Sequence, residues 1–332
     1  MGLAGGYAEP MRAPITLDLH LPNFNYPDTA EDQVFDKLVE IATAAEQSGF
    51  SSISLMDHFH QIPGVGPQTN WMFEGPTMLA ALAARTSQLT FGLLVGGVTY
   101  RNPAHHAKIT TTLDVLSGGR AWHALGAAWF EDEHRAYGFE FPPLKERFER
   151  LEEALQIARA MFREGGATFE GRHFHVDGAH NNPRPLRGDI PIVVGGSGER
   201  KTLRLVAQYA DGCNLFGNLE RARHLLSVLE SHSDEVNRDP AEITKTRMSV
   251  VAIAPTHEQA AAKLDQMRRA GIPEERVASV LAGDADEVAE QAHAFAEIGI
   301  EGMTLSLPDV HDPETVALTG ATLGPVFASA VS

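Results

Sequence analysis

The chain has 332 residues, of which 43% are hydrophobic and 21% are charged, so it is long and apolar enough to bury a large core. Asp and Glu outnumber Lys and Arg by 44 to 27, giving a formal charge of -17, which argues against a broad surface for nucleic acid or anionic membranes. A single cysteine, Cys213, excludes an intrachain disulfide framework and a cysteine-based zinc site, and it fits a reducing, cytoplasmic setting.

The N-terminal segment carries no recognisable targeting signal. Residues 1–13 lack a charged stretch followed by an apolar one, so no secretory signal is expected. No apolar run reaches the roughly 18 residues of a membrane span. We therefore predict a flexible tail over residues 1–13 and a single domain over 14–332.

Strands and helices alternate along this domain. Continuous apolar runs predict buried strands, and segments with helical apolar spacing lie between them. The predicted strands cover residues 15–23, 51–58, 89–98, 120–129, 191–198, 211–217, 246–255 and 300–308. The predicted helices cover residues 30–49, 75–87, 102–119, 144–165, 199–210, 219–236, 257–271, 283–299 and 313–329. A short hairpin and loop interrupts the alternation at 167–190.

Eight strands alternating with helices predict an α/β fold, a closed (β/α)₈ barrel with an insertion near 167–190. The alternative is an open, doubly wound sheet that binds a dinucleotide at the "VVGGSG" segment, residues 193–198. That fingerprint belongs in the first strand–helix unit, whereas these glycines come two thirds of the way along the chain. The position of the glycines favours the barrel.

Functional residues of such a barrel lie at the C-terminal ends of its strands. The second strand ends in "MDHFH", which places a carboxylate and two imidazoles at one strand end, at Asp57, His58 and His60. The fourth strand ends in "GAAW", where the small residues Gly126 and Ala127 leave a slot beside Trp129. These ends are candidates for contact with a ligand.

Two further strand ends are rich in glycine. The segment Gly195–Gly198 directly precedes a helix, and with the hydroxyls of Ser197 and Thr202 it could bind a phosphate through free backbone N–H groups. The other interpretation is a tight turn that uses glycine for its backbone angles. At Val95-Gly96-Gly97, the glycines indicate a bulge or a backbone pressed against a flat ligand, unless they only relieve crowding.

No metal site is predicted. His173, His175 and His180 lie on the expected hairpin, but no cysteine or acidic residue has a matching spacing. Sequence signatures of a serine hydrolase, a P-loop and a zinc protease are also absent from the chain.

The segments "AEQSGFSSISLMDHFH", "GLLVGGVTYRNPAHHAKITTTLDVLSGGRAWHALGAAWFEDEHRAYG", "FEGRHFHV" and "PIVVGGSGERKTLRLVAQYADGCN" make the chain resemble the bacterial luciferase-like monooxygenase superfamily. Within it, the chain is similar to the F420-dependent oxidoreductase branch. The resemblance covers residues 15 to about 310 and implies a (β/α)₈ barrel with an insertion.

The resemblance also implies roles for the strand ends. Asp57 and His58 would border the ring of the cofactor, with a non-proline cis peptide forming a bulge behind it at Val95, Gly96 and Gly97. The turn 195–198 would hold the phosphate. We expect His58 to move the proton, with His60 as the alternative, and Asp57 to fix a loop or a backbone amide. The expected cofactor site comprises Asp57, Val95, Gly96, Gly97, Gly126, Ala127, Gly195, Gly196, Ser197, Gly198 and Thr202, and the substrate pocket Phe24, His60, Trp71 and Trp129.

One position departs from the family pattern. Sugar-phosphate dehydrogenases of this branch carry a glutamate as general acid where this chain has Trp129, and Glu131 is nearby but shifted. Glucose-6-phosphate chemistry is therefore doubtful, and a more apolar or aromatic substrate is expected.

The resemblance predicts hydride transfer between F420 and a small organic substrate. The alternative on the same scaffold is a monooxygenase that uses reduced FMN and oxygen and needs a separate reductase. A non-enzymatic flavin-binding protein is a further alternative. A flavin-free lyase or isomerase would need a lysine or a carboxylate pair at the strand ends, and none stands out. The sequence leaves open the substrate, the direction of transfer and whether the protein is a homodimer.

Overall fold

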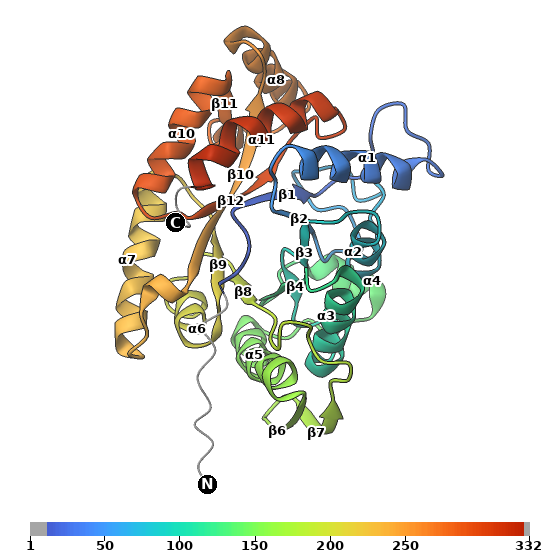
Figure 1. Cartoon of the computed structure of the whole chain (residues 1–332), viewed down its shortest axis with the longest axis vertical. Helices are drawn as coiled ribbons and strands as arrows, with labels where there is room; N and C mark the ends of the chain where they lie inside the picture. The colour runs from blue at the N-terminus through green and yellow to red at the C-terminus, as the bar shows by residue number, and fades with distance from the viewer. Residues whose placement is uncertain (1–11, 329–332) are drawn as a thin grey trace.

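Parallel strands form a barrel that helices surround in a computed structural model describing residues 12–328 (Figure 1). The strands are hydrogen-bonded in the order β3-β2-β1-β12-β10-β9-β8-β5-β4. The sheet closes on itself because Phe91 of β3 forms a parallel bridge with Ala121, next to β5, and β4 pairs with β5 further along. The predicted (β/α)₈ architecture is confirmed.

All eight predicted strands are present, the third as two pieces, β3 and β4. The barrel strands are β1 (Leu17–Leu21), β2 (Ser52–Leu55), β3 (Thr90–Leu93), β4 (Gly96–Gly97), β5 (His123–Gly126), β8 (Ile192–Gly195), β9 (Gly212–Leu215), β10 (Thr244–Ile253) and β12 (Gly302–Ser306). The helices are α1 (Val34–Gln47), α2 (Gly75–Ala83), α3 (Pro103–Ser117), α4 (Glu131–Tyr137), α5 (Leu144–Glu164), α6 (Thr202–Tyr209), α7 (Leu219–Glu235), α8 (His257–Arg269), α9 (Glu274–Val277), α10 (Ala285–Glu297) and α11 (Pro313–Ala328).

The insertion is a two-stranded antiparallel hairpin of β6 (Gly166–Glu170) and β7 (His175–His180), as predicted. It lies at the edge of the molecule beside the end of α5 (Figure 1). Four short elements were not predicted: α4, α9, the 3-10 helix η1 (Pro240–Glu242) and β11 (Leu281–Gly283), which pairs with the end of β10. Each has seven residues or fewer, too short to show a periodic apolar pattern.

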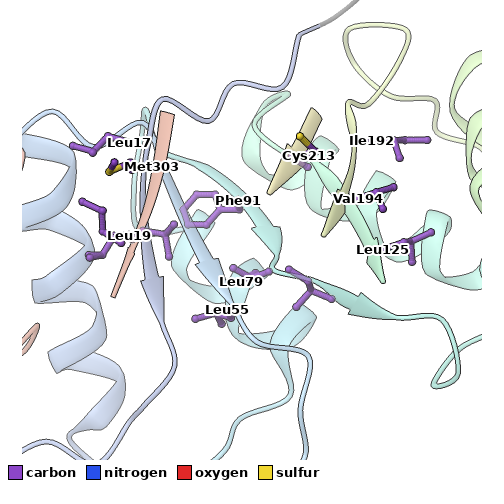
Figure 2. Close-up of a cluster of buried hydrophobic side chains, with 14 of the residues drawn as sticks. Leu17, Leu19, Leu55, Leu79, Phe91, Leu125, Ile192, Val194, Cys213 and Met303 are labelled. Carbon is purple, nitrogen blue, oxygen red and sulfur yellow. The ribbon is translucent and has the colours of Figure 1, made fainter. Parts of the chain in front are cut away.

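Side chains alternate between the two faces of each barrel strand. The outward set, including Leu17 and Leu19 of β1 and Val194 of β8, packs in the hydrophobic layer between barrel and helices (Figure 2). Because one face of each strand is buried in this layer, most strands carry an apolar residue at every second position.

The inward side chains divide the barrel interior into an apolar and a polar half. Trp122, Ala124 and Val193 form a small apolar cluster on the β5 and β8 side. On the opposite side several inward residues are polar and joined by hydrogen bonds. Asn214 donates to the hydroxyl groups of Thr246 at 2.9 Å and of Thr304 at 3.0 Å.

The N-terminal segment enters the base of the barrel. Residues 1–11, most of the predicted tail, lie outside the described residues. Ala13 is 6% exposed and packs with Ile15 in the same cluster as Trp122, so the packed chain begins one residue before the predicted domain boundary. Between residues 12 and 328, no helix combines the length and hydropathy of a membrane span.

Candidate active site

The C-terminal ends of the barrel strands open into one cavity of about 1630 Å³. Its volume exceeds the roughly 300–1,000 Å³ typical of small-molecule sites, so it has room for a large cofactor together with a substrate. The predicted site residues that line it are Asp57, His58, Val95, Gly96, Gly97, Gly126, Ala127, Trp129, Gly195, Gly196 and Thr202. The strand ends singled out in the sequence therefore meet at one place.

Five predicted site residues are not part of the cavity wall. Phe24 is 1% exposed and packs edge-on against Phe73 in the core. The ring of His60 lies 5.5 Å from that of Tyr137, and Trp71 packs against the core. Ser197 and Gly198 belong to the glycine turn but lie beyond the wall.

His58 is held by Glu133, a residue that the sequence analysis did not select. The Nδ1 atom of His58 lies 2.6 Å from Oε1 of Glu133, whose side chain is completely buried. The same carboxylate accepts hydrogen bonds from the Tyr100 hydroxyl and, at 2.8 Å, from the backbone N–H of Phe59. Glu133 thus fixes both the imidazole and the loop that carries it.

The charge of Glu133 decides which nitrogen of His58 carries the hydrogen. Burial alone would raise the pKa of Glu133, but hydrogen bonds from His58, Tyr100 and Phe59 outweigh it and lower the pKa below its ordinary value. An ionised carboxylate only accepts hydrogen bonds, so Nδ1 of His58 must be the donor. In the neutral imidazole, Nε2 is then a proton acceptor, and it has no partner among the described residues.

Asp57 stabilises the backbone around the site. Its carboxylate accepts a hydrogen bond from the backbone N–H of Gly97 at 2.9 Å and two from the Arg101 guanidinium at 2.7 and 2.9 Å. The other terminal nitrogen of Arg101, Nη2, donates to Oε1 of Glu74 at 2.9 Å. Asp57 therefore ties the end of β2 to β4, and it is the backbone amide, not the imidazole, that it contacts.

A non-proline cis peptide bond joins Leu94 and Val95, between β3 and β4, where the resemblance placed one. The side chain of Val95 fills the space next to two strand-end glycines. A Cβ atom at Gly126 would lie 2.6 Å from Cγ2 of Val95, and one at Gly195 would lie 2.6 Å from Cγ1. Crowding by Val95 is thus a sufficient reason for both glycines, without any ligand.

The glycine turn after β8 leads into α6, which begins at Thr202. Gly196 has a φ of +124°, a conformation that favours glycine. Between residues 197 and 201 no backbone N–H donates a hydrogen bond to a described residue. The Ser197 hydroxyl accepts from the Phe216 backbone N–H at 2.8 Å, so it fastens the turn to the end of β9.

The mouth of the cavity is apolar. Trp129, Leu144 and Phe216 line it and remain 55%, 56% and 48% exposed. The ring of Trp129 stacks on Phe130 at 5.2 Å and meets His58 edge-on at 5.5 Å. Such large exposed apolar side chains, gathered around one opening, are typical of a binding site for an apolar ligand.

Several residues of the site were missed because their side chains arrive from outside the strand ends. Glu133 lies on the unpredicted helix α4, whereas Glu131, the acid noticed in the sequence, is exposed and pairs with Arg135 at 3.5 Å. The segment "EDEH", residues 131–134, was the available signal for Glu133. If these residues form a helical turn, only one face of it can point inward, so Glu131 and Glu133 cannot both reach the site. Asn214 and His20, from the middle of strands, also line the cavity.

Comparison with known proteins places this geometry in a family. The model of the luciferase-like monooxygenase family matches residues 16–321. The F420-dependent glucose-6-phosphate dehydrogenase 1 of Rhodococcus jostii is 30% identical over 328 residues, which cover 87% of this chain and 93% of that protein.

Two solved structures share the fold at low identity. An F420-dependent secondary alcohol dehydrogenase in complex with an F420-acetone adduct has a TM-score of 0.79 and 19% identity, covering 96% of this chain and 99% of that one. The EDTA monooxygenase of Chelativorans sp. has a TM-score of 0.80 and 16% identity, covering 96% and 94%.

If the side chain of Val95 is the reason for glycine at position 126, the loss of unfolding free energy caused by a side chain at 126 must depend on Val95. We expect Gly126→Ala to lower the free energy of unfolding by about 1–3 kcal/mol, because the added methyl group overpacks the barrel interior. In a Val95→Ala background the same change should cost at least about 0.5 kcal/mol less. Urea denaturation of the wild type, Gly126→Ala, Val95→Ala and the double variant measures both free-energy costs. Gly324→Ala, whose Cβ meets nothing within 4 Å, is the control. Equal costs in both backgrounds would contradict the explanation.

Proposed function

Since the chain belongs to the luciferase-like monooxygenase family, we propose that it is an F420-dependent oxidoreductase that transfers a hydride between this deazaflavin and a small organic substrate. The observation that carries the proposal is that one cavity joins a free imidazole nitrogen and an apolar mouth, and that the glycine turn at its edge leads into unpaired backbone amides. The choice of F420 over FMN rests on the similarity to the Rhodococcus dehydrogenase.

The residues present fit a ring cofactor with a phosphate group. Asn214, which lies on the cavity floor, supports the fit of a ring cofactor. Its buried Oδ1 has no hydrogen-bond partner among the described residues and could accept from a ring N–H. The amides of residues 198–201, at the start of α6, and the Thr202 hydroxyl would hold the phosphate. When bound, F420 supplies a carbon that accepts or donates a hydride.

In this proposal His58 moves the proton that accompanies the hydride. Oxidation of an alcohol removes a hydride from carbon and a proton from oxygen, and Nε2 of His58 is an acceptor on the cavity side. Glu133 holds the ring through Nδ1 and stabilises the imidazolium that forms. Trp129 and Phe130 pack in T-shaped contact with the imidazole.

The proposed substrate is apolar or aromatic rather than a sugar phosphate. Among the described residues that line the cavity, Lys263 is the only Lys or Arg, and its ammonium group is paired with Asp309 at 2.5 Å. By the resemblance, Trp129 stands where the sugar-phosphate dehydrogenases of this branch carry their general acid. Trp129, Leu144 and Phe216 at the mouth offer contacts to hydrocarbon instead.

F420 should bind this protein more tightly than FMN. Equilibrium titration of the purified protein with each oxidised cofactor, followed by absorbance or fluorescence, measures both affinities. Tighter binding of FMN, together with oxygen consumption when a reductase supplies reduced FMN, would instead support the monooxygenase. A protein that binds F420 but oxidises none of a broad alcohol panel would favour a non-enzymatic flavin-binding role.

A negative charge in the glycine turn should weaken cofactor binding. Gly196→Asp and Gly196→Ala impose the same backbone strain at a φ of +124°, but only the first brings a carboxylate to the proposed phosphate site. We expect the Asp variant to bind F420 at least about tenfold more weakly than the Ala variant, or roughly 1.4 kcal/mol. Equal affinities of the two variants would remove the turn from the phosphate site.

Loss of the His58 imidazole should slow turnover without abolishing cofactor binding. With the alcohol that is oxidised fastest, His58→Ala should lower kcat by roughly 10²–10⁴ at saturating F420. His60→Ala is the matched control, because His60 neighbours the same loop but does not line the cavity, and it should keep most of its turnover. A His58→Ala variant that loses F420 affinity yet keeps kcat would show that His58 only packs against the cofactor.

A further inference from the structure

A second imidazole, that of His20, reaches the same cavity from its floor. His20 lies on β1 directly opposite Ser54 of β2. Its Nδ1 atom lies 2.9 Å from Oγ of Ser54, and this hydroxyl in turn donates to Oδ2 of Asp18 at 2.6 Å. All three side chains are buried, with exposures of 3% or less. They form one continuous hydrogen-bonded chain from the cavity into the barrel interior.

The hydroxyl in the middle of this chain fixes the direction of every hydrogen bond. Ser54 has a single hydrogen, and while Asp18 is ionised this hydrogen goes to the carboxylate. The Ser54 oxygen must then accept from His20, which places the imidazole hydrogen on Nδ1. The Nε2 atom of His20 is therefore the proton acceptor.

That acceptor atom has access to the cavity. His20 is a residue of the cavity wall. Nε2 of His20 makes no hydrogen bond to a described residue. It is nevertheless not one of the fully buried polar atoms that lack a partner, in contrast to Oδ1 of Asp18. Nε2 thus meets the open space rather than packed atoms. His58, on the same cavity, disfavours a positive charge on His20.

Asp18 at the far end is suited to hold a proton. Burial raises its pKa from 3.8 to about 6, although neighbouring hydroxyls oppose the rise. Those hydroxyls belong to Ser54, Ser52 and Thr304, on the strands at either side of β1. Burial likewise lowers the pKa of His20 to about 3, so His20 does not keep a proton that it receives near neutral pH.

We propose that His20, Ser54 and Asp18 form a proton relay, in which His20 takes a proton from an O–H or N–H group of the ligand on the cavity floor and Asp18 stores it. The ligand's proton binds Nε2, Nδ1 releases its hydrogen to Ser54 Oγ, and Ser54 passes its own hydrogen to Oδ2 of Asp18. One proton moves, no electrons are exchanged, the ligand gains one negative charge and Asp18 becomes neutral.

The relay deepens the proposed function and rests on it. A hydride transfer changes the charge of both the substrate and the cofactor, and His58 exchanges a proton with only one of them. A merely structural chain would also position His20, but it would not couple the tautomer of His20 to the charge of Asp18. That coupling distinguishes the two roles. Once Asp18 is protonated, Ser54 can donate to Nδ1, and the imidazole hydrogen then resides on Nε2.

The test reads this tautomer in the cofactor-free full-length protein. Nitrogen-15 NMR of histidine-labelled protein distinguishes a protonated ring nitrogen from an unprotonated one, and His20→Gln assigns the signal by its loss. At pH 8 we expect the hydrogen on Nδ1. As the pH falls through about 6, it should move to Nε2 while the ring stays neutral. A ring that carries its hydrogen on Nε2 at pH 8, or whose tautomer ignores pH, overturns the relay.

Two serines of β2 supply matched variants. Ser54→Ala removes the link and should abolish the pH-dependent change of tautomer. Ser52→Ala removes an equally buried hydroxyl beside Asp18, one that donates to the Thr90 carbonyl at 3.2 Å but not towards His20. It should preserve the change and move it to a higher pH, because Ser52 no longer opposes the raised pKa of Asp18. The same change in Ser54→Ala, or its loss in Ser52→Ala, would contradict the proposal.

An infrared measurement follows the other end of the chain. The protonated-carboxyl band of the wild type should contain a component that rises as the pH falls through about 6 and that is missing from Asp18→Asn. Its persistence in Asp18→Asn would overturn the storage role of Asp18. Because neither readout uses F420, a failure of the relay is distinguishable from a failure of the proposed cofactor, which the titration measures.

Discussion

The arrangement of the cavity depends on Asp57, which forms an ion pair with Arg101 and accepts a hydrogen bond from a backbone amide. One carboxylate holds the backbone of Gly97 and the guanidinium of Arg101, so the segment 97–101 is fastened to the end of β2. Successive side chains of an extended chain point to opposite sides, and with Asp57 fixed towards β4 the next residue, His58, is directed towards Glu133. The position of the imidazole thus depends on the contacts of Asp57 as well as on its own contact with Glu133.

Two of the histidines that line the cavity, His58 and His20, are held through the same ring atom. Nδ1 of His58 meets Glu133, and Nδ1 of His20 meets Ser54, so each ring is left with Nε2 facing the ligand space. The partners differ in kind. Glu133 is a nearby carboxylate that can stabilise a charged imidazolium directly, whereas Ser54 is neutral and can only pass a hydrogen on to Asp18. One cavity thus combines an imidazole suited to carry charge with one suited to transmit a proton.

The glycines at the strand ends show why a sequence motif can be located correctly and explained incompletely. The sequence analysis interpreted Gly126 as part of a slot beside Trp129 and Gly195 as part of a phosphate-binding turn, and both residues do line the cavity. Yet the side chain of Val95, projecting after the cis peptide, already occupies the place of a Cβ atom at both. A pattern of small residues reports that something large is close, and only the folded chain shows that the neighbour belongs to the protein itself.

The sequence by itself determined the barrel and the strand ends that form its cavity. Buried parallel strands need continuous apolar runs and their helices need periodic ones, and both patterns are local, so all eight strands could be predicted together with Asp57, His58 and the turn at 195–198. Only the tertiary structure decided which partners those residues have. Glu133 reaches His58 across 75 positions and Ser54 reaches Asp18 across 36, and Phe24, expected at the substrate, turns into the core. Such pairings depend on strand register and on a seven-residue helix, and neither leaves a periodic signal in the chain.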